Sequence, residues 1–216
     1  LRPAISPATI VLPLANGVNN AQRIRDIVPD ADVLNGLVYI SSFIEAPGVI
    51  RQIGGSRALV FGPENGGTER CAAIETLLRG AGINATLSSN VRLDVWSKFI
   101  FLSALAAVTT LTGKNFGELQ KDAEHMALLR ELMEETRHVG NALGVSFPPD
   151  AADSALGKFA GFPPETKTSM QLDAERGKRT ELSELVGSVV DMGARTGVAT
   201  PRYAEVFARL CEKVRA

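Results

Sequence analysis

The pattern of apolar and polar positions changes character near residue 90. Before that point, short apolar runs bounded by Gly, Pro and Asn predict strands, and longer periodic segments predict helices. Continuous apolar runs of this length are typical of a parallel sheet that is covered on both faces. A glycine pair between two of the runs, Gly54-Gly55, is expected to form a hairpin turn. The expected strands cover 9–14, 33–42, 49–53, 58–61 and 84–87, and the expected helices cover 19–28 and 68–82.

After residue 90 the apolar positions recur with helical periodicity, and no strand is expected. The predicted fold class is therefore α/β followed by all-α, with one domain over 1–90 and a helical domain over 91–216. The expected helices cover 94–112, 123–143, 165–176, 180–196 and 203–214.

One of these helices is almost wholly apolar and carries a single lysine near its start. It runs from Trp96 to Gly113 with the sequence WSKFIFLSALAAVTTLTG, and its lysine is Lys98. A helix without a polar face is buried, so burial should favour the neutral amine and lower the pKa of the lysine. Such a lysine can exchange a proton near neutral pH. The alternative is a structural lysine whose ammonium group extends to solvent from the end of a core helix.

Composition and charge narrow the function classes. The chain has 23 basic and 24 acidic residues and a net charge of −1, which argues against a nucleic-acid partner or a polybasic membrane surface. The apolar segment 99–112 is interrupted by Ser and Thr and is expected to be too short for a membrane span. Two distant cysteines and two histidines are too few for a metal site and are compatible with a reducing, cytoplasmic setting.

Several catalytic motifs are missing. The glycine-rich segment 62–67 lacks both GxGxxG spacing and a Walker lysine, and we interpret it as a connection between a strand and a helix. Neither GxSxG nor HExxH occurs. The densest polar cluster is TSMQLDAERGKRTE at 168–181, which on its own is typical of a solvated helix face.

Five segments in register nevertheless resemble the ketopantoate reductase (2-dehydropantoate 2-reductase) family. They are LANGV at 14–18, PG at 47–48, the lysine helix at 96–113, SMQLDAERGKRTE at 169–181 and GVATP at 197–201. The resemblance implies a Rossmann-type domain followed by a helical domain similar to the C-terminal part of 6-phosphogluconate dehydrogenase. It also implies NADPH-dependent reduction of ketopantoate to pantoate, a CH–OH oxidoreductase reaction of pantothenate and coenzyme A biosynthesis. Family members begin with a strand, GxGxxG and a helix, so we expect the N-terminal part of the Rossmann domain to be missing from this chain.

The resemblance assigns roles to individual residues. Lys98 stands at the position of the family's catalytic lysine, which gives a proton to the ketone oxygen. Asn16 would lie near both the nicotinamide and the substrate, and Ser42 near the cofactor. Ser169 corresponds to a serine that binds the substrate, and Glu181 to a glutamate on the cofactor side.

The chain departs from the family at three positions on the substrate side. The family has asparagines four and eight residues after the lysine and another in the following loop, where this chain has Leu102, Ala106 and Phe116. Asn115 is adjacent to the third and could replace it as a substrate ligand. The alternatives to a ketopantoate reductase are a relative that acts on a less polar 2-oxo acid or ketone, and a non-catalytic helical dimerisation module. Long apolar faces in 99–111 and 182–192 are expected to be exposed and make a homodimer plausible.

Overall fold

The computed structural model describes residues 5–64 and 68–215, and its chain divides into two compact units. Unit 1 is Leu1–Val95 and unit 2 is Trp96–Ala216. The predicted fold class is confirmed, because an α/β part precedes a helical part, and the described residues after 90 form no strand. The division falls inside α3 (Val91–Thr112) rather than at residue 90, since Val91 and Val95 pack against Leu37 of unit 1.

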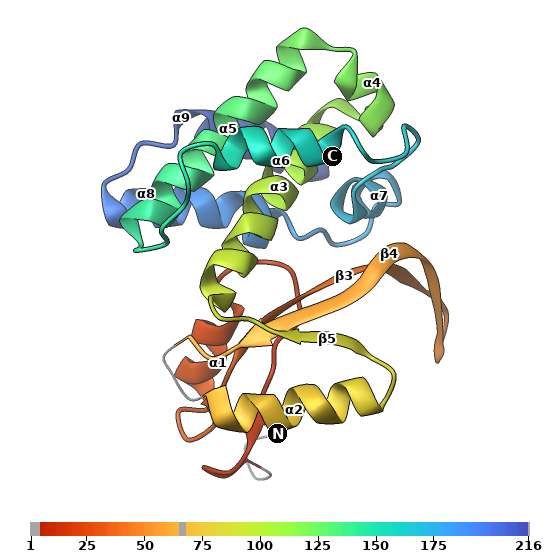
Figure 1. Ribbon diagram of the computed structural model, residues 1–216. Coiled ribbons are helices and arrows are strands. Elements are labelled where there is room, and N and C mark those ends of the chain that lie inside the picture. The colour runs from red at the N-terminus through yellow and green to blue at the C-terminus, as the bar shows by residue number, and fades with distance from the viewer. Residues whose placement is uncertain (1–4, 65–67, 216) are drawn as a thin grey trace. The chain divides into compact units, whose positions relative to one another are not determined.

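Unit 1 contains two small sheets. Strands β1 and β2 form a parallel pair, while β4 pairs with β3 in antiparallel and with β5 in parallel orientation. Helix α2 packs against β5 (Figure 1). Its Cys71 lies in a core with Phe61 and Ala85 of the sheet. The elements are β1 (Ile10–Val11), α1 (Asn20–Ile27), β2 (Asp32–Val33), β3 (Asn35–Ala46), β4 (Val49–Gly62), α2 (Thr68–Gly80) and β5 (Asn84–Leu87).

The prediction of a hairpin turn at Gly54-Gly55 is wrong. The chain turns at Pro47-Gly48, and the two strands expected at 49–53 and 58–61 form one long strand, β4. The glycine pair lies in a bulge of β4, because Ser41 pairs with Gly54 whereas Tyr39 pairs with Ala58. A bulge and a turn both require a backbone that glycine adopts easily, which is why the sequence did not separate them. Residues 65–67 of the segment interpreted as a connection lie outside the described residues.

The bulge gives a prediction for stability. Gly55 has a φ of +87°, and a Cβ there would lie 2.6 Å from the carbonyl oxygen of Tyr39. Gly48 has a similar φ of +78° but open space around it, so it isolates the effect of the clash. We expect Gly55→Ala to lower the free energy of unfolding by roughly 1–3 kcal/mol more than Gly48→Ala, measured by urea denaturation. Equal losses in the two variants would contradict this packing of the bulge.

Unit 2 consists of helices, and α5 packs against α4, α6, α8 and α9. Two short helices were not predicted: α4, which Asn115 caps, and α6, which follows Pro148, Pro149 and Asp150. The helix predicted over 180–196 contains a π-helical turn, η2, followed by α8. The elements after α3 are α4 (Phe116–Gln120), α5 (Ala123–Ala142), α6 (Ala151–Phe159), α7 (Ser169–Glu175), η2 (Ser183–Gly187), α8 (Ser188–Thr196) and α9 (Pro201–Arg215).

Helix α3 is the buried helix that the sequence predicts. From Ser103 to Thr110 no side chain is more than 3% exposed. The whole helix has 22 residues and is by length and composition apolar enough to cross a membrane, whereas the prediction concerned only its residues 99–112. Its most apolar window is 67% buried by the rest of the chain, as expected for a core helix.

Buried hydrogen bonds hold α3 to its neighbours. The hydroxyl of Tyr203 on α9 lies 2.7 Å from the Ser103 hydroxyl on α3 and accepts a hydrogen bond of 3.0 Å from Thr136 on α5. The carboxylate of Glu135 accepts hydrogen bonds from the backbone N–H groups of Arg202 and Tyr203, which satisfies the first turn of α9. These contacts fix three helices against one another.

The apolar faces predicted to be exposed are largely buried within the chain. Phe99, Leu105 and Val108 on α3 are at most 2% exposed, as are Leu185, Val189 and Met192 in the other segment. That argument for a dimer is therefore wrong, because these faces form the core of unit 2.

Candidate active site

Lys98 lies in the second turn of α3, on the part of the helix that is still partly exposed. Burial lowers the pKa of its ammonium group below the ordinary value of 10.5, and the negative charge of Glu181 opposes this shift. The predicted lowering of the pKa is confirmed. A desolvated lysine that a carboxylate keeps protonated is a suitable proton donor, since the amine releases its proton more easily than a solvated lysine does.

Glu181 comes from the segment between α7 and η2. Its backbone carbonyl accepts a hydrogen bond of 2.8 Å from the N–H of Leu185, so it stands where the helical turns begin. The π-helical turn follows immediately, and such turns often occur at functional sites. The negative charge of Glu181 thus acts on Lys98, although 82 positions separate the two residues in the chain.

The effect of the Glu181 charge on Lys98 predicts how the ammonium group of Lys98 titrates. The lysine should lose its proton at a pH below 10.5, and removing the opposing negative charge in Glu181→Gln should move the pKa further down. The ¹⁵Nζ or ¹³Cε resonance of Lys98, followed by NMR, measures both values. Glu184→Gln is the matched control, since Glu184 does not contribute to the pKa of Lys98. A Lys98 pKa at or above 10.5, or no change in Glu181→Gln, would contradict the assignment.

Ser169 and Asn115 lie near the C-terminal half of α3. Ser169 is the exposed first residue of α7, and the hydroxyl of its neighbour Thr168 lies 2.7 Å from that of Thr109 on α3. Thr109 follows Lys98 by eleven residues, or about 16 Å of helix. Asn115 uses its side-chain oxygen to cap α4, accepting from the N–H of Glu118. Their roles as substrate ligands stay predictions.

Asn16 and Ser42 belong to unit 1. Asn16 follows β1, and its carbonyl accepts a hydrogen bond of 3.0 Å from the side chain of Asn20 at the start of α1. The carboxyl end of a parallel strand is where doubly wound sheets bind nucleotides, so this position fits the nicotinamide end of a cofactor. Ser42 is exposed on β3, opposite Gln52. Cofactor contacts of both residues stay predictions.

The three departures from the family pattern have different surroundings. Leu102 is partly exposed one turn beyond Lys98, Ala106 is completely buried, and Phe116 packs edge-on against Phe159 with ring centroids 4.9 Å apart. Two aromatic residues that contact each other near Leu102, namely Phe101 and Phe162, were not predicted as site residues. Phe101 could have been found from its spacing of three to Lys98, whereas nothing in the local sequence of Phe162 indicates its contact with α3.

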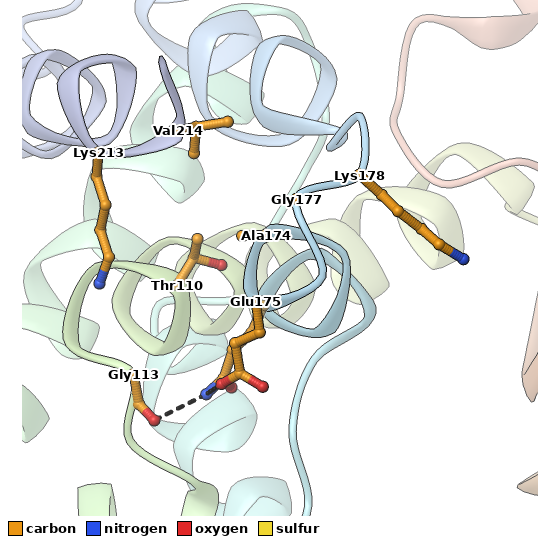
Figure 2. A pocket seen from close by; sticks show the side chains of 9 residues that line it. Thr110, Gly113, Ala174, Glu175, Gly177, Lys178, Lys213 and Val214 are labelled. Atoms are coloured by element: carbon orange, nitrogen blue, oxygen red, sulfur yellow. Dashed lines mark hydrogen bonds between the residues drawn. The ribbon is translucent and has the colours of Figure 1, made fainter. Parts of the chain in front are cut away.

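A separate pocket of about 200 Å³ lies where α3, α7 and α9 end. Gln171 crosses it and donates a hydrogen bond of 2.9 Å to the carbonyl of Gly113, which Figure 2 shows as a dashed line. The side chain of Lys178 extends away from the other lining residues (Figure 2). Lys98 does not line this pocket, so we interpret the contacts of Gln171 as an anchor that joins α7 to the end of α3.

Within residues 5–64 and 68–215, no group of three or more His, Cys, Asp or Glu could hold a metal ion.

A Rossmann-like part followed by a helical part that carries a desolvated lysine is the architecture of a pyridine-nucleotide-dependent oxidoreductase. Two family descriptions match the chain: "Ketopantoate reductase PanE/ApbA" over residues 1–66 and "Ketopantoate reductase PanE/ApbA C terminal" over residues 90–213. The chain belongs to the ketopantoate reductase PanE/ApbA family.

The individual relatives belong to the same family but carry different functional names. The chain is 31% identical over 193 residues to a 2-dehydropantoate 2-reductase of Mesorhizobium japonicum. The alignment covers 89% of this chain and 59% of that protein. It is 28% identical over 211 residues to the uncharacterized oxidoreductase YkpB of Bacillus subtilis, and this alignment covers 97% of this chain and 70% of YkpB. The structure of a PanE/ApbA family ketopantoate reductase from Ralstonia eutropha superposes with a TM-score of 0.87 at 30% identity. The superposition covers 99% of this chain and 70% of that one.

At lower identity the likeness shows the fold alone. A dimeric ketopantoate reductase from Staphylococcus aureus superposes with a TM-score of 0.82 at 19% identity, over 95% of this chain and 68% of that one. The chain thus spans roughly 60 to 70% of the length of these proteins.

Proposed function

We propose that the protein reduces a 2-oxo acid to the corresponding 2-hydroxy acid with NADPH, and that ketopantoate (2-dehydropantoate) is the substrate that family membership favours. The observation that carries the proposal is the desolvated Lys98, on which the negative charge of Glu181 acts, in the helical unit that the family description matches. Partial desolvation of a lysine lowers stability because it disfavours the charged form, and a role in proton transfer accounts for its presence here.

Lys98 supplies the proton in this mechanism. When bound, the reduced nicotinamide supplies a hydride for the ketone carbon. Lys98 donates a hydrogen bond to the ketone oxygen, stabilises the negative charge that develops there, and transfers its proton as the hydroxyl forms. The neutral amine then recovers a proton from solvent. Glu181 keeps Lys98 protonated before the reaction and helps to order the cofactor side of the site.

The remaining assignments follow the family resemblance. Asn16 contacts the nicotinamide and the substrate, Ser42 and Glu181 contact the cofactor, and Ser169 and Asn115 bind the substrate. We also propose a homodimer, which is compatible with the fold that the chain shares with a dimeric ketopantoate reductase. A cytoplasmic location is compatible with Cys71 and Cys211, which are both free thiols. A role in pantothenate biosynthesis follows from the family resemblance.

A second candidate is a reductase of a less polar 2-oxo acid or ketone. The partly exposed Leu102, one helical turn after Lys98, favours it because a leucine offers no hydrogen bond to a substrate hydroxyl. A non-catalytic dimerisation module is disfavoured by the desolvated Lys98 on which the charge of Glu181 acts, since such a module would not require this pair of residues.

A substrate panel tests the proposal. The full-length gene product is mixed with NADPH or NADH and a series of 2-oxo acids, and nucleotide oxidation is followed by absorbance. We expect turnover of at least one 2-oxo acid, with NADPH preferred. A folded protein that oxidises neither nucleotide with any 2-oxo acid would contradict the proposed function.

A further inference from the structure

On the C-terminal side of Lys98, the partly exposed part of α3 is small and apolar. Phe101 and Leu102 follow Lys98 by three and four residues, so their side chains lie on either side of it on the same helix face. The eight residues that follow Leu102 are buried, with exposed fractions of at most 3%. A molecule held by the Lys98 ammonium group therefore meets an aromatic ring and a leucine on this helix.

A second aromatic ring extends this surface. Phe162, in the loop after α6, stacks on Phe101 with ring centroids 5.4 Å apart and an angle of 24° between the planes. Phe116 contacts Phe162 edge-on at 5.6 Å. Although two rings hold it, Phe162 remains 41% exposed, so part of its surface is available to a ligand.

The loop that carries Phe162 is well anchored. The carbonyls of Pro164 and Thr166 accept hydrogen bonds of 2.8 and 3.0 Å from the N–H groups of Gly117 and Phe116 at the start of α4. A Cβ at Gly117 would lie 2.5 Å from Cβ of Pro164, so the two backbones approach as closely as a glycine allows. An aromatic ring that is already fixed loses little conformational freedom when a ligand packs against it.

We propose that Phe162, Phe101 and Leu102 form the specificity surface for the substrate side chain, and that the preferred substrate is a 2-oxo acid with an aromatic side chain. This inference rests on the proposed reduction of a 2-oxo acid and develops its second candidate, a substrate less polar than ketopantoate. An aromatic side chain packs on the Phe162–Phe101 stack while the ketone oxygen receives its hydrogen bond from Lys98. A hydroxylated side chain such as that of ketopantoate leaves its hydroxyl against rings and methyl groups, without a partner from this surface.

The test compares substrate preference in matched variants. Values of kcat/KM for phenylglyoxylate and ketopantoate are measured on the full-length gene product and on Phe162→Ala. Phe43→Ala is the control, since Phe43 is similarly exposed (38%) but belongs to the β3–β4 hairpin of unit 1. We expect the wild type to prefer phenylglyoxylate by about 10- to 100-fold, the range that one hydroxyl against an apolar surface supports. Phe162→Ala should lower this ratio about tenfold, and Phe43→Ala should leave it unchanged.

Leu102→Asn supplies the converse test, because an added amide should raise kcat/KM for ketopantoate relative to phenylglyoxylate. A wild type that prefers ketopantoate, or a Phe162→Ala variant that loses both activities equally, would overturn the specificity surface while leaving the proposed function intact. Absence of turnover with every 2-oxo acid would instead overturn the proposed function, and this inference with it.

Discussion

Replacing Lys98 with methionine is expected to lower kcat for 2-oxo acid reduction by about 10²- to 10⁴-fold, which is the usual contribution of a positioned general acid. Methionine keeps much of the apolar stem that packs at the start of α3 but cannot donate a proton. The KM for the nucleotide should change little, since the proposed role of Lys98 is toward the ketone oxygen. Steady-state kinetics on the full-length gene product measures both values.

Lys121→Met is the control for this substitution. Lys121 is exposed after α4 and has the same side-chain chemistry without the burial that lowers the pKa of Lys98. We expect its kcat to remain within about threefold of the wild type, as for a surface substitution. A Lys98→Met variant that also stays within this range would exclude Lys98 as the acid.

The second large effect is expected at Tyr203, whose side chain is completely buried between α3, α5 and α9. Tyr203→Ala should lower the free energy of unfolding by about 3–5 kcal/mol, because it removes an aromatic core side chain and leaves a cavity. Tyr203→Phe should cost only about 1–2 kcal/mol, since it keeps the ring and loses the hydrogen bonds to Ser103 and Thr136. Urea denaturation followed by fluorescence measures these values, and the single tryptophan, Trp96, reports on unit 2.

Val214→Ala on the same helix is the matched control. Val214 is 36% exposed, so its truncation should change the free energy of unfolding by about 0.5 kcal/mol or less. A loss in Tyr203→Ala no greater than that in Val214→Ala would contradict the packing that holds α3 in place.

The sequence predicts long elements better than short or irregular ones. The periodicity of 94–112 and 123–143 identifies α3 and α5, because their apolar faces repeat over many turns. Helix α6 has nine residues, too few for a clear period, and it follows two prolines. The bulge at Gly55 has the local composition of a turn, and only the pairing of β3 with β4 distinguishes the two.

The candidate site shows the same limit. The burial of Lys98 follows from the apolar sequence around it, and its lowered pKa follows from that burial. The family resemblance assigned Glu181 to the cofactor side of the site, but the effect of its charge on Lys98 was not predicted, since no local pattern joins two residues so far apart in the chain. The stacking of Phe162 on Phe101 depends on the fold of a loop and could not be predicted from the residues near it.

The most direct test of the proposed function follows the hydride into the product. The full-length gene product is incubated with NADPH that carries deuterium at the transferable position of C4 and with the 2-oxo acid that it turns over fastest. Mass spectrometry then identifies the product. The account predicts a 2-hydroxy acid with one deuterium on C2, formed in equal amount to the oxidised nucleotide and greatly slowed in Lys98→Met. A folded protein that forms no deuterated 2-hydroxy acid from any 2-oxo acid would contradict it.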